Sequence, residues 1–247
     1  LSLTLRTCPD RCGMPPQAPA VSLFHRFRGV CLAASAGVGA AVLPAAFAQG
    51  AFDPHPPSAE AREVADWALR TGDSGGRALV IVDKRQARVF VLDPSGRWEA
   101  DAPVLLGSAR GDESAPGIGE RPLSQIRPEE RTTPAGRFIA EPGVNANGED
   151  IVWVDYDTAV SMHRVRTRVK AERRLERLAS ATPEDNRISY GCINLPRRFY
   201  EQVLVPAVRA GAVVYVLPDT RPLGEVFPLG RRPASHPPQA SAGAAAV

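Results

Sequence analysis

The sequence predicts a mainly β protein with a few helices and one principal domain. Short apolar segments separated by tight turns follow one another over residues 78–106, as in an antiparallel meander. Helical periodicity is confined to short stretches, chiefly residues 58–70 and 196–210. A chain of 247 residues, of which 44% are hydrophobic, is long enough for one well-formed core or a small pair of domains.

The first 48 residues have the pattern of a leader that is removed on export. Residues 25–28 form a basic start, and residues 30–42 form an apolar segment that is too short for a comfortable membrane span. Residues 46–48 are an A-x-A cleavage pattern, and Met14 is a plausible true start. We therefore expect a periplasmic protein. The alternative is an inner-membrane anchor formed by an uncleaved signal.

Residues 49–76 are expected to form a Pro-rich linker followed by an N-terminal helix. Ser58 is a suitable N-cap, and alanine and valine side chains recur on one face of the helix. This face is expected to pack on the domain at 77–218. Residues 219–247 are rich in proline and small residues without an apolar period, so we predict a disordered tail.

The domain is expected to open with strands at 78–83 and 87–92, joined by a polar turn. Residues 98–106 continue the meander, and this direct succession of strands disfavours a Rossmann fold. Six or seven strands are expected in all. The further strands are predicted at 137–141, 151–156, 158–163 and 212–217.

Two long segments interrupt the strands. Residues 107–131 combine glycine, proline and charge, and a loop of this length is uncommon without a role of its own. It is expected either to border a binding groove or to be a solvated insertion. Residues 164–188 contain a stretch of helix formers at 169–179. This helix is expected to pack on the domain or, alternatively, to overhang a groove.

The stretch Ser189-Tyr190-Gly191-Cys192-Ile193-Asn194 carries the candidate chemistry. Once the leader is removed, Cys192 is the only cysteine left, so it cannot form an internal disulfide. In an oxidising compartment such a thiol is either a buried structural group or a reactive one. Because a helix is predicted from residue 196, its positive end is expected to favour the Cys192 thiolate.

A nucleophilic cysteine needs a base. Of the histidines that follow the leader, His55 lies in the Pro-rich entry and His236 in the predicted tail. His163 ends an apolar run that is predicted to be a strand. The sequence therefore predicts that His163 and Cys192 act together.

The order of His163, a spacer and Ser-x-Gly-Cys-x-Asn resembles the active-site signature of L,D-transpeptidases of the YkuD family. Residues 133–138 resemble the Thr-Pro-x-Gly-x-Phe segment of that family, and the resemblance covers roughly residues 77–218. It implies a mixed β-sandwich whose cysteine attacks a stem peptide of peptidoglycan. A thioester would form and then pass to an amine or to water. The resemblance also implies that carbapenems acylate the cysteine and that penicillins largely do not.

The turn that carries Cys192, residues 189–194, is called the nucleophile turn, and it is expected to form the pocket around the reacting carbonyl. The N–H groups of Gly191 and Cys192 are the expected donors to the oxyanion, and Ser189, Tyr190 and Asn194 are expected to shape the site. The resemblance further implies that a backbone carbonyl, that of Arg164, orients the imidazole of His163. Arginines near the turn are candidates to hold stem-peptide carboxylates, or they are solvated. These arginines are Arg164, Arg187 and Arg197.

Two departures from the family pattern leave the activity open. Tyr190 stands where the family usually has a second histidine, and the spacer 164–188 is longer than is usual. A phenol donates a hydrogen bond but does not carry a proton at neutral pH. A hydrolase on the same scaffold (an L,D-carboxypeptidase or endopeptidase) and a catalytically silent wall-binding protein are therefore alternatives. Papain-like enzymes are disfavoured, because in them the cysteine precedes the histidine.

Composition excludes several partner classes. The net charge is +3, and no basic block is interleaved with aromatic residues, which argues against nucleic acid. No histidine, cysteine or carboxylate cluster has the spacing of metal ligands, so neither a metal nor a cofactor is expected. No apolar run of membrane length follows the leader. We expect a monomer whose partner is the peptidoglycan stem peptide and whose role lies in cell-wall biogenesis and cell shape.

Overall fold

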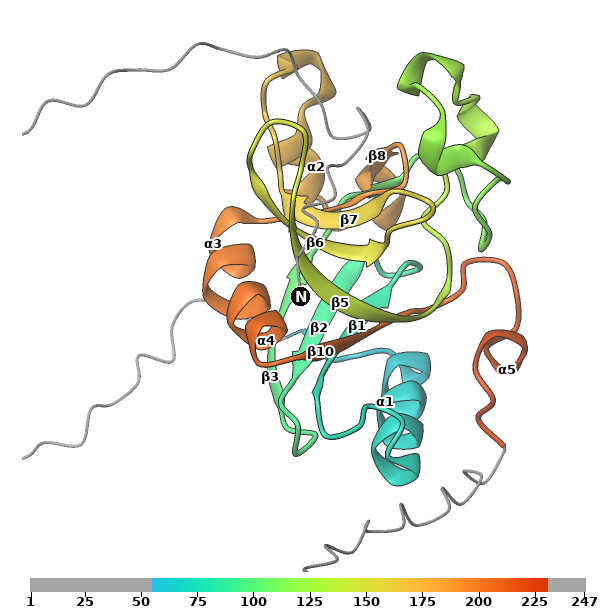
Figure 1. Cartoon of the computed structure of the whole chain (residues 1–247), viewed down its shortest axis with the longest axis vertical. Coiled ribbons are helices and arrows are strands. Elements are labelled where there is room, and N and C mark those ends of the chain that lie inside the picture. Colours follow the sequence, from blue (N-terminus) through green and yellow to red (C-terminus); the bar gives the residue numbers. More distant parts are fainter. Residues whose placement is uncertain (1–54, 231–247) are drawn as a thin grey trace, which may run out of the picture.

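The computed structural model describes residues 55–230 (Figure 1). The predicted leader, most of the predicted linker and residues 231–247 of the predicted tail lie outside the described residues. The strands are β1 (Ala78–Asp83), β2 (Arg88–Leu92), β3 (Trp98–Pro103), β4 (Leu106–Gly107), β5 (Gly136–Val144), β6 (Asp150–Asp155), β7 (Val160–Arg164), β8 (Arg187–Ser189), β9 (Ile193–Leu195) and β10 (Ala212–Val216). The helices are α1 (Ala59–Thr71), α2 (Arg174–Ala179), α3 (Arg197–Phe199), α4 (Val205–Arg209) and α5 (Leu223–Val226).

The mainly β fold class is confirmed, although the described residues contain more strands than the six or seven predicted. Eight strands form one sheet in the order β3-β2-β1-β10-β5-β6-β7-β9, and β4 pairs with β8. The additional strands are the two-residue β4 and the three-residue β8 and β9. Such short segments show no alternation of apolar residues that a sequence pattern could reveal.

Strand β5 joins the two halves of a sandwich. Its first half pairs with β10 and its second half with β6, and the strand curves around the body of the molecule in Figure 1. A bridge between Leu105 and Asn194 connects the far ends of the large sheet. The two halves therefore face each other, as the predicted β-sandwich requires.

The core lies between these halves. Alternate residues of β1 and β2 point inward and meet alternate residues of β6, β7 and β9. These inward residues include Val80, Val82, Val89, Val91, Val152, Met162, Ile193 and Leu195. The opposite faces of β1 and β10 are also buried, which explains their continuous apolar sequences.

Helix α1 forms as predicted and covers this second face. The Ser58 hydroxyl accepts a hydrogen bond from the Ala61 N–H at 3.0 Å, and Gly72 ends the helix at φ 68°. Trp67 of α1 contacts Tyr215 of β10 edge to face, with ring centroids 6.2 Å apart.

The domain continues past residue 218, so the prediction of a disordered tail is wrong for residues 219–230. Asp219 is buried, and Leu223 and Phe227 pack against α1 and β10. The Phe227 ring lies 6.3 Å from that of Trp67. Only a few apolar side chains make these contacts, and they have no regular period in the sequence.

Two predicted helices differ in detail. Residues 197–209 are helical, but a π-turn, η7 (Tyr200–Leu204), separates α3 from α4. Pro206 lacks an N–H and would crowd the carbonyl four residues earlier, which a wider turn relieves. The predicted helix 169–179 is broken into η5 (Lys170–Glu172) and α2, because Arg173 between them has a left-handed conformation at φ 49°.

Residues 107–131 and the segment 165–186 project from the same end of the molecule (Figure 1). The first contains three 3-10 turns, η2 (Ile118–Glu120), η3 (Leu123–Gln125) and η4 (Pro128–Glu130). The second contains α2 and the turn η6 (Pro183–Asn186). An ion pair between Arg110 and Glu184 links the two segments. Between residues 55 and 230, no helix is both long enough and apolar enough to cross a membrane.

Candidate active site

Strands β6, β7 and β9 carry the candidate site on the face that points away from the core. Val152, Met162 and Ile193 point inward, so their sequence neighbours point outward. In the strand register, Trp153 lies beside Ser161, and His163 lies beside Asn194. Cys192 immediately precedes β9 and is therefore level with Ser161.

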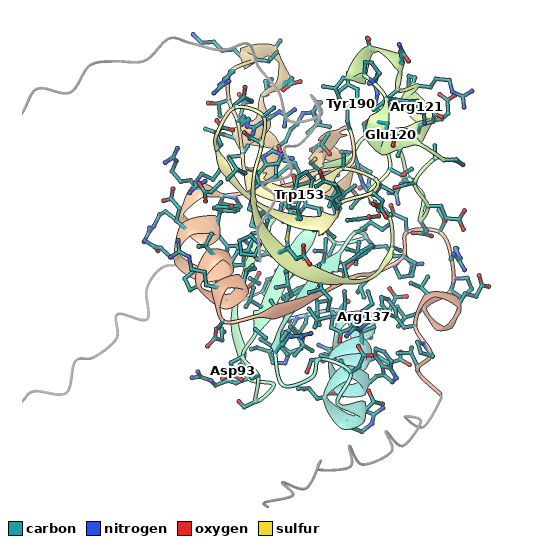
Figure 2. All side chains as sticks on the ribbon, in the orientation of Figure 1. Asp93, Glu120, Arg121, Arg137, Trp153 and Tyr190 are labelled. Carbon is teal, nitrogen blue, oxygen red and sulfur yellow. The ribbon has the colours of Figure 1, made fainter. Side chains whose placement is uncertain are left out.

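The thiol of Cys192 is enclosed by this face. Its Sγ lies 3.7 Å from the Ser161 hydroxyl and 3.7 Å from the Ala159 carbonyl oxygen. The side chain packs with Ile151 and Trp153, and the residue is only 7% exposed. Figure 2 shows Trp153 in the middle of the molecule, on the layer formed by β6 and β7.

His163 has a defined proton position. Its Nδ1 lies 2.8 Å from the carbonyl oxygen of Arg164, the contact that the family resemblance implies. A carbonyl oxygen only accepts hydrogen bonds, so Nδ1 must carry the proton. In the neutral ring Nε2 is then the proton acceptor, as a general base requires.

The fold brings His163 and Cys192 to adjoining places. His163 is two residues along β7 from Ser161, or about 7 Å at the backbone. It points to the same face as Ser161, whose hydroxyl touches the thiol. His163 and Cys192 therefore occupy diagonal positions on the same face of the paired segments β7 and β9.

The nucleophile turn is closed by Ser189. Its hydroxyl donates to the carbonyl of Cys192 at 2.6 Å and accepts from the N–H of Gly191 at 3.1 Å. Because the Gly191 N–H is used inside the turn, our expectation that it serves as an oxyanion donor is wrong. Gly191 has φ 128°, and a Cβ at this position would lie 2.7 Å from the Thr132 carbonyl oxygen, so only glycine fits.

The predicted helix end at the thiol is also absent. Strand β9 separates Cys192 from α3, because Ile193 and Leu195 pair with β7 and fill the core. The helical segment begins only at Arg197, beyond β9, so its positive end does not lie at Cys192.

Asn194 supports the turn from the other side. Its Nδ2 donates to the carbonyl of Cys192 at 3.2 Å, and its Oδ1 accepts from Arg174 Nη1 at 2.5 Å. Asn194 is fully buried, as expected for a residue that holds the motif backbone. Arg174 was not among the predicted site residues, because an arginine in a helix-forming stretch gives no local signal of a distant partner.

Tyr190 contacts the last residue of the segment 107–131. The guanidinium of Arg131 lies over the Tyr190 ring, 4.2 Å from the centroid. Figure 2 shows Tyr190 at the end of the molecule from which Glu120 and Arg121 also project. The aromatic ring at this position therefore packs against a cation.

The three predicted carboxylate-binding arginines have different environments. Arg187 donates to Asp219 at 2.6 Å and to the Lys84 carbonyl at 2.8 Å, and its side chain is 8% exposed. It is a buried structural residue, so its prediction as a substrate ligand is wrong. The sequence could not reveal this because Asp219 was assigned to the predicted tail.

Arg164 and Arg197 lie instead beside a pocket of about 360 Å³ that His163 also lines. Arg164 pairs with Asp150 at 2.8 Å and with Glu201 at 2.8 Å. The Arg164 guanidinium holds the pKa of Asp150 below its usual value. Arg197 pairs with Glu201 at 3.2 Å, but its side chain remains 74% exposed.

The fold and this face define a β-sandwich protein with a cysteine and an oriented histidine on neighbouring strands. Within residues 55–230, no group of three or more His, Cys, Asp and Glu residues is arranged to hold a metal. No family model matches the chain, and no curated protein matches it.

Several solved structures are similar to the chain. One is the catalytic domain of an L,D-transpeptidase from E. faecium, with 18% identity, a TM-score of 0.34 and coverage of 57% of this chain and 98% of that one. Another is an L,D-transpeptidase from Xylanimonas cellulosilytica, with 12% identity, a TM-score of 0.35 and coverage of 57% and 60%. A third is the helical cell shape determining protein Pgp2 from Campylobacter jejuni, with 14% identity, a TM-score of 0.36 and coverage of 66% and 57%. The aligned region spans 48% of the chain in the Ldtfm-avibactam carbamoyl enzyme structure.

Proposed function

We propose that this protein is an exported cysteine acyltransferase that acts on the stem peptides of peptidoglycan, an L,D-transpeptidase. The observation that supports the proposal most directly is the orientation of His163. Its Nδ1–H donates to the Arg164 carbonyl, so that Nε2 is available as the base on the face that carries Cys192. The order of the motifs in the sequence supports the enzyme class, and the A-x-A leader supports export.

The first half-reaction transfers the acyl group to the enzyme. Nε2 of His163 accepts the proton of the Cys192 thiol, and the thiolate attacks the carbonyl that follows the third residue of a tetrapeptide stem. As the tetrahedral intermediate collapses, the C–N bond to the terminal D-alanine breaks. The leaving amine takes the proton from His163, and a thioester on Cys192 remains.

The second half-reaction regenerates the thiol. The amine of a second stem gives a proton to Nε2 of His163 and attacks the thioester carbonyl. A peptide bond forms, the C–S bond breaks, and the thiolate recovers the proton. Both half-reactions pass through an oxyanion, for which the backbone N–H of Cys192 is the proposed donor.

The pocket beside His163 is the proposed place for charged groups of the stem. Arg197 has the most exposed guanidinium among the three predicted arginines, at 74%. We propose that Arg164 and Arg197 contact a stem carboxylate there, with Arg164 held in place by Asp150.

The test is muropeptide analysis. The mature protein would be incubated with sacculi that carry tetrapeptide stems, with Cys192→Ala as the control, and the products identified by mass spectrometry. The expected product is a crosslink between two third-position residues. Release of D-alanine without crosslinks would favour a carboxypeptidase, and shortened crosslinks would favour an endopeptidase. An unchanged digest together with retention on sacculi would favour a silent wall-binding protein.

A further inference from the structure

We propose that Thr133 is a positioning residue that sets the plane of the Gly191–Cys192 peptide, and that the buried Lys84 holds Thr133 in place. This inference rests on the proposed function, because its consequence is the direction of the Cys192 N–H during acyl transfer. Thr133 opens the segment 133–138, for which the sequence motif gave a resemblance but no role for the threonine.

The hydroxyl of Thr133 has an unambiguous hydrogen-bond arrangement. Its Oγ1 lies 2.9 Å from the N–H of Gly107 and 2.9 Å from the carbonyl oxygen of Gly191. The Gly107 N–H only donates, so the single hydroxyl proton must point to the Gly191 carbonyl. Thr133 is 1% exposed, so water does not compete for these bonds.

This bond determines where the Cys192 N–H points. In a trans peptide the C=O and the N–H point in opposite directions, and the described residues contain no cis peptide bond. Fixing the Gly191 oxygen on Thr133 therefore directs the Cys192 N–H to the other side of the peptide plane. Glycine restrains its own dihedral angles least, so the plane after Gly191 needs support from outside the turn.

Lys84 supports Thr133 from behind. Its Nζ donates to the carbonyls of Thr133 at 2.7 Å and Gly111 at 2.7 Å, and to Asp112 at 2.8 Å. These three bonds use all three protons of the ammonium group. The Lys84 side chain is fully buried, and the Asp219 carboxylate, 3.9 Å away, adds a second opposite charge.

The arrangement reaches from the hairpin after β1 to the nucleophile turn. Lys84 fixes the backbone of Thr133, and the Thr133 side chain fixes the Gly191 carbonyl. Valine has nearly the shape of threonine and would fill the same space. The shape of the cavity therefore does not require a hydroxyl at position 133. The hydroxyl is needed to accept from the Gly107 N–H and to hold the Gly191 carbonyl, and only the second bond bears on the direction of the Cys192 N–H.

The test compares two reactions of the same thiol. Acylation by a carbapenem or a tetrapeptide stem develops an oxyanion, whereas alkylation by iodoacetamide is a direct displacement that develops none. We expect Thr133→Val to slow acylation by about 10- to 100-fold, since loss of a whole oxyanion donor costs about 100- to 1,000-fold. The rate of alkylation and its pH dependence should stay within about twofold of wild type, because thiolate formation does not depend on this bond.

Thr133→Ser is the matched control, because it keeps the hydroxyl and should acylate at nearly the wild-type rate. Lys84→Met combined with Asp112→Asn, which avoids an unpaired buried carboxylate, should show the same selective loss of acylation. If this double variant does not fold, the valine and serine variants at position 133 still decide the matter.

Three outcomes would overturn the inference. Acylation of Thr133→Val at the wild-type rate would mean that the peptide plane needs no support. An equal loss of acylation and alkylation would mean that Thr133 only maintains the structure around the thiol. A wild-type protein that is alkylated but never acylated would overturn the proposed function, and this inference with it.

Discussion

Cys192 is held more tightly through its backbone than through its thiol. Its carbonyl accepts from both Ser189 and Asn194 at 2.6 and 3.2 Å, whereas its Sγ lies 3.7 Å from the Ser161 hydroxyl and from the Ala159 carbonyl oxygen. A fixed backbone suits a nucleophile, because the sulfur must move toward a carbonyl carbon while its surroundings stay in place.

Replacing Cys192 by alanine should abolish acylation and leave the fold intact. Cys192 is the only thiol between residues 55 and 230, and the lost side chain is small, so the free energy of unfolding should fall by no more than about 1 kcal/mol. Intact-mass measurement after exposure to a carbapenem and urea unfolding check the two parts. An adduct on the alanine variant would contradict a covalent role for Cys192.

Tyr190→Phe and Tyr190→His should separate the ring of Tyr190 from its hydroxyl. Phenylalanine keeps the ring under Arg131 and should lower the acylation rate only by the equivalent of about 1 kcal/mol, one neutral hydrogen bond. The histidine variant should acylate at neutral pH but lose activity faster than wild type in acid, at a pH below the ordinary imidazole pKa of about 6.5, because the Arg131 cation disfavours the imidazolium. Acylation rates measured against pH test this. A silent wild type and an active histidine variant would mean that the natural site does not acylate.

At the scale of elements, the segment 165–186 is hydrogen-bonded to residues that support the candidate site. Arg174 donates to Asn194, and Asn186 donates to the Val104 carbonyl at 2.9 Å. A simple lid would contact the domain only when closed. These buried contacts instead make the segment part of the scaffold that holds the nucleophile turn.

Arg174→Ala should therefore affect catalysis more than a change in a surface arginine would. It removes a charged donor from the fully buried Asn194, which should lower the free energy of unfolding by about 1.5–3 kcal/mol. Because Asn194 also donates to the Cys192 carbonyl, its displacement should slow acylation. Arg173→Ala is the matched control, because that side chain is 70% exposed and pairs with Glu176 on the same segment. Thermal unfolding and acylation kinetics measure both effects, and equal behaviour of the two variants would contradict the role given to Arg174.

Replacing residues 166–183 by a short Gly/Ser linker is predicted to change KM or acceptor choice more than thioester formation, provided that the loss of Arg174 is accounted for. The Arg174→Ala variant supplies that baseline. Steady-state kinetics with two acceptor amines would measure the difference. A folded deletion variant that acylates much more slowly than Arg174→Ala would show that the segment does more than control access.

At the scale of the whole molecule, the Lys84–Asp112 pair ties the two ends of the domain together. Asp112 accepts from Lys84 and from the backbone N–H groups of residues 219 and 221. Burial alone would raise the pKa of Asp112, but these donors outweigh it and hold the pKa well below its usual range. The ionised carboxylate is therefore the form that the fold favours.

This shift predicts acid lability. An aspartate whose pKa is lower in the folded state contributes stability above its unfolded value of about 4, and the contribution is lost as the pH falls below that value. Asp112→Asn should cost about 3–5 kcal/mol at pH 7, because it leaves Lys84 as a poorly compensated buried charge. The variant should also show a flatter dependence of stability on pH between about 4 and 2. Urea unfolding across this range, with no difference in slope from wild type, would contradict the assignment.

Residues 219–230 should be required for stability. Phe227 is 1% exposed and contacts Trp67, so Phe227→Ala should cost about 3–5 kcal/mol. Glu225→Ala is the matched control, because this side chain is 56% exposed and its ion pair lies on the surface, where such pairs contribute little. Thermal unfolding of both variants makes the comparison, and similar midpoints would argue that α5 is not part of the core.

Local patterns in the sequence were enough for several features of the fold. The Ser58 cap, the stripe of α1 and the apolar runs of β1 and β2 depend on residues within one or two turns of each other. The proposal that His163 acts with Cys192 came from motif order and from the scarcity of histidines and cysteines. These inferences needed no knowledge of which distant segments meet.

The tertiary structure alone decided how the site is supported. Arg187 is buried with Asp219, β9 stands between the nucleophile and α3, and Arg174 reaches Asn194 from the longer spacer. The Thr133–Gly191 bond joins residues 58 positions apart, and the Lys84–Thr133 bond joins residues 49 apart. A threonine or a lysine shows no local sign of such a partner. The burial that makes these bonds strong arises only when the two halves of the sandwich close.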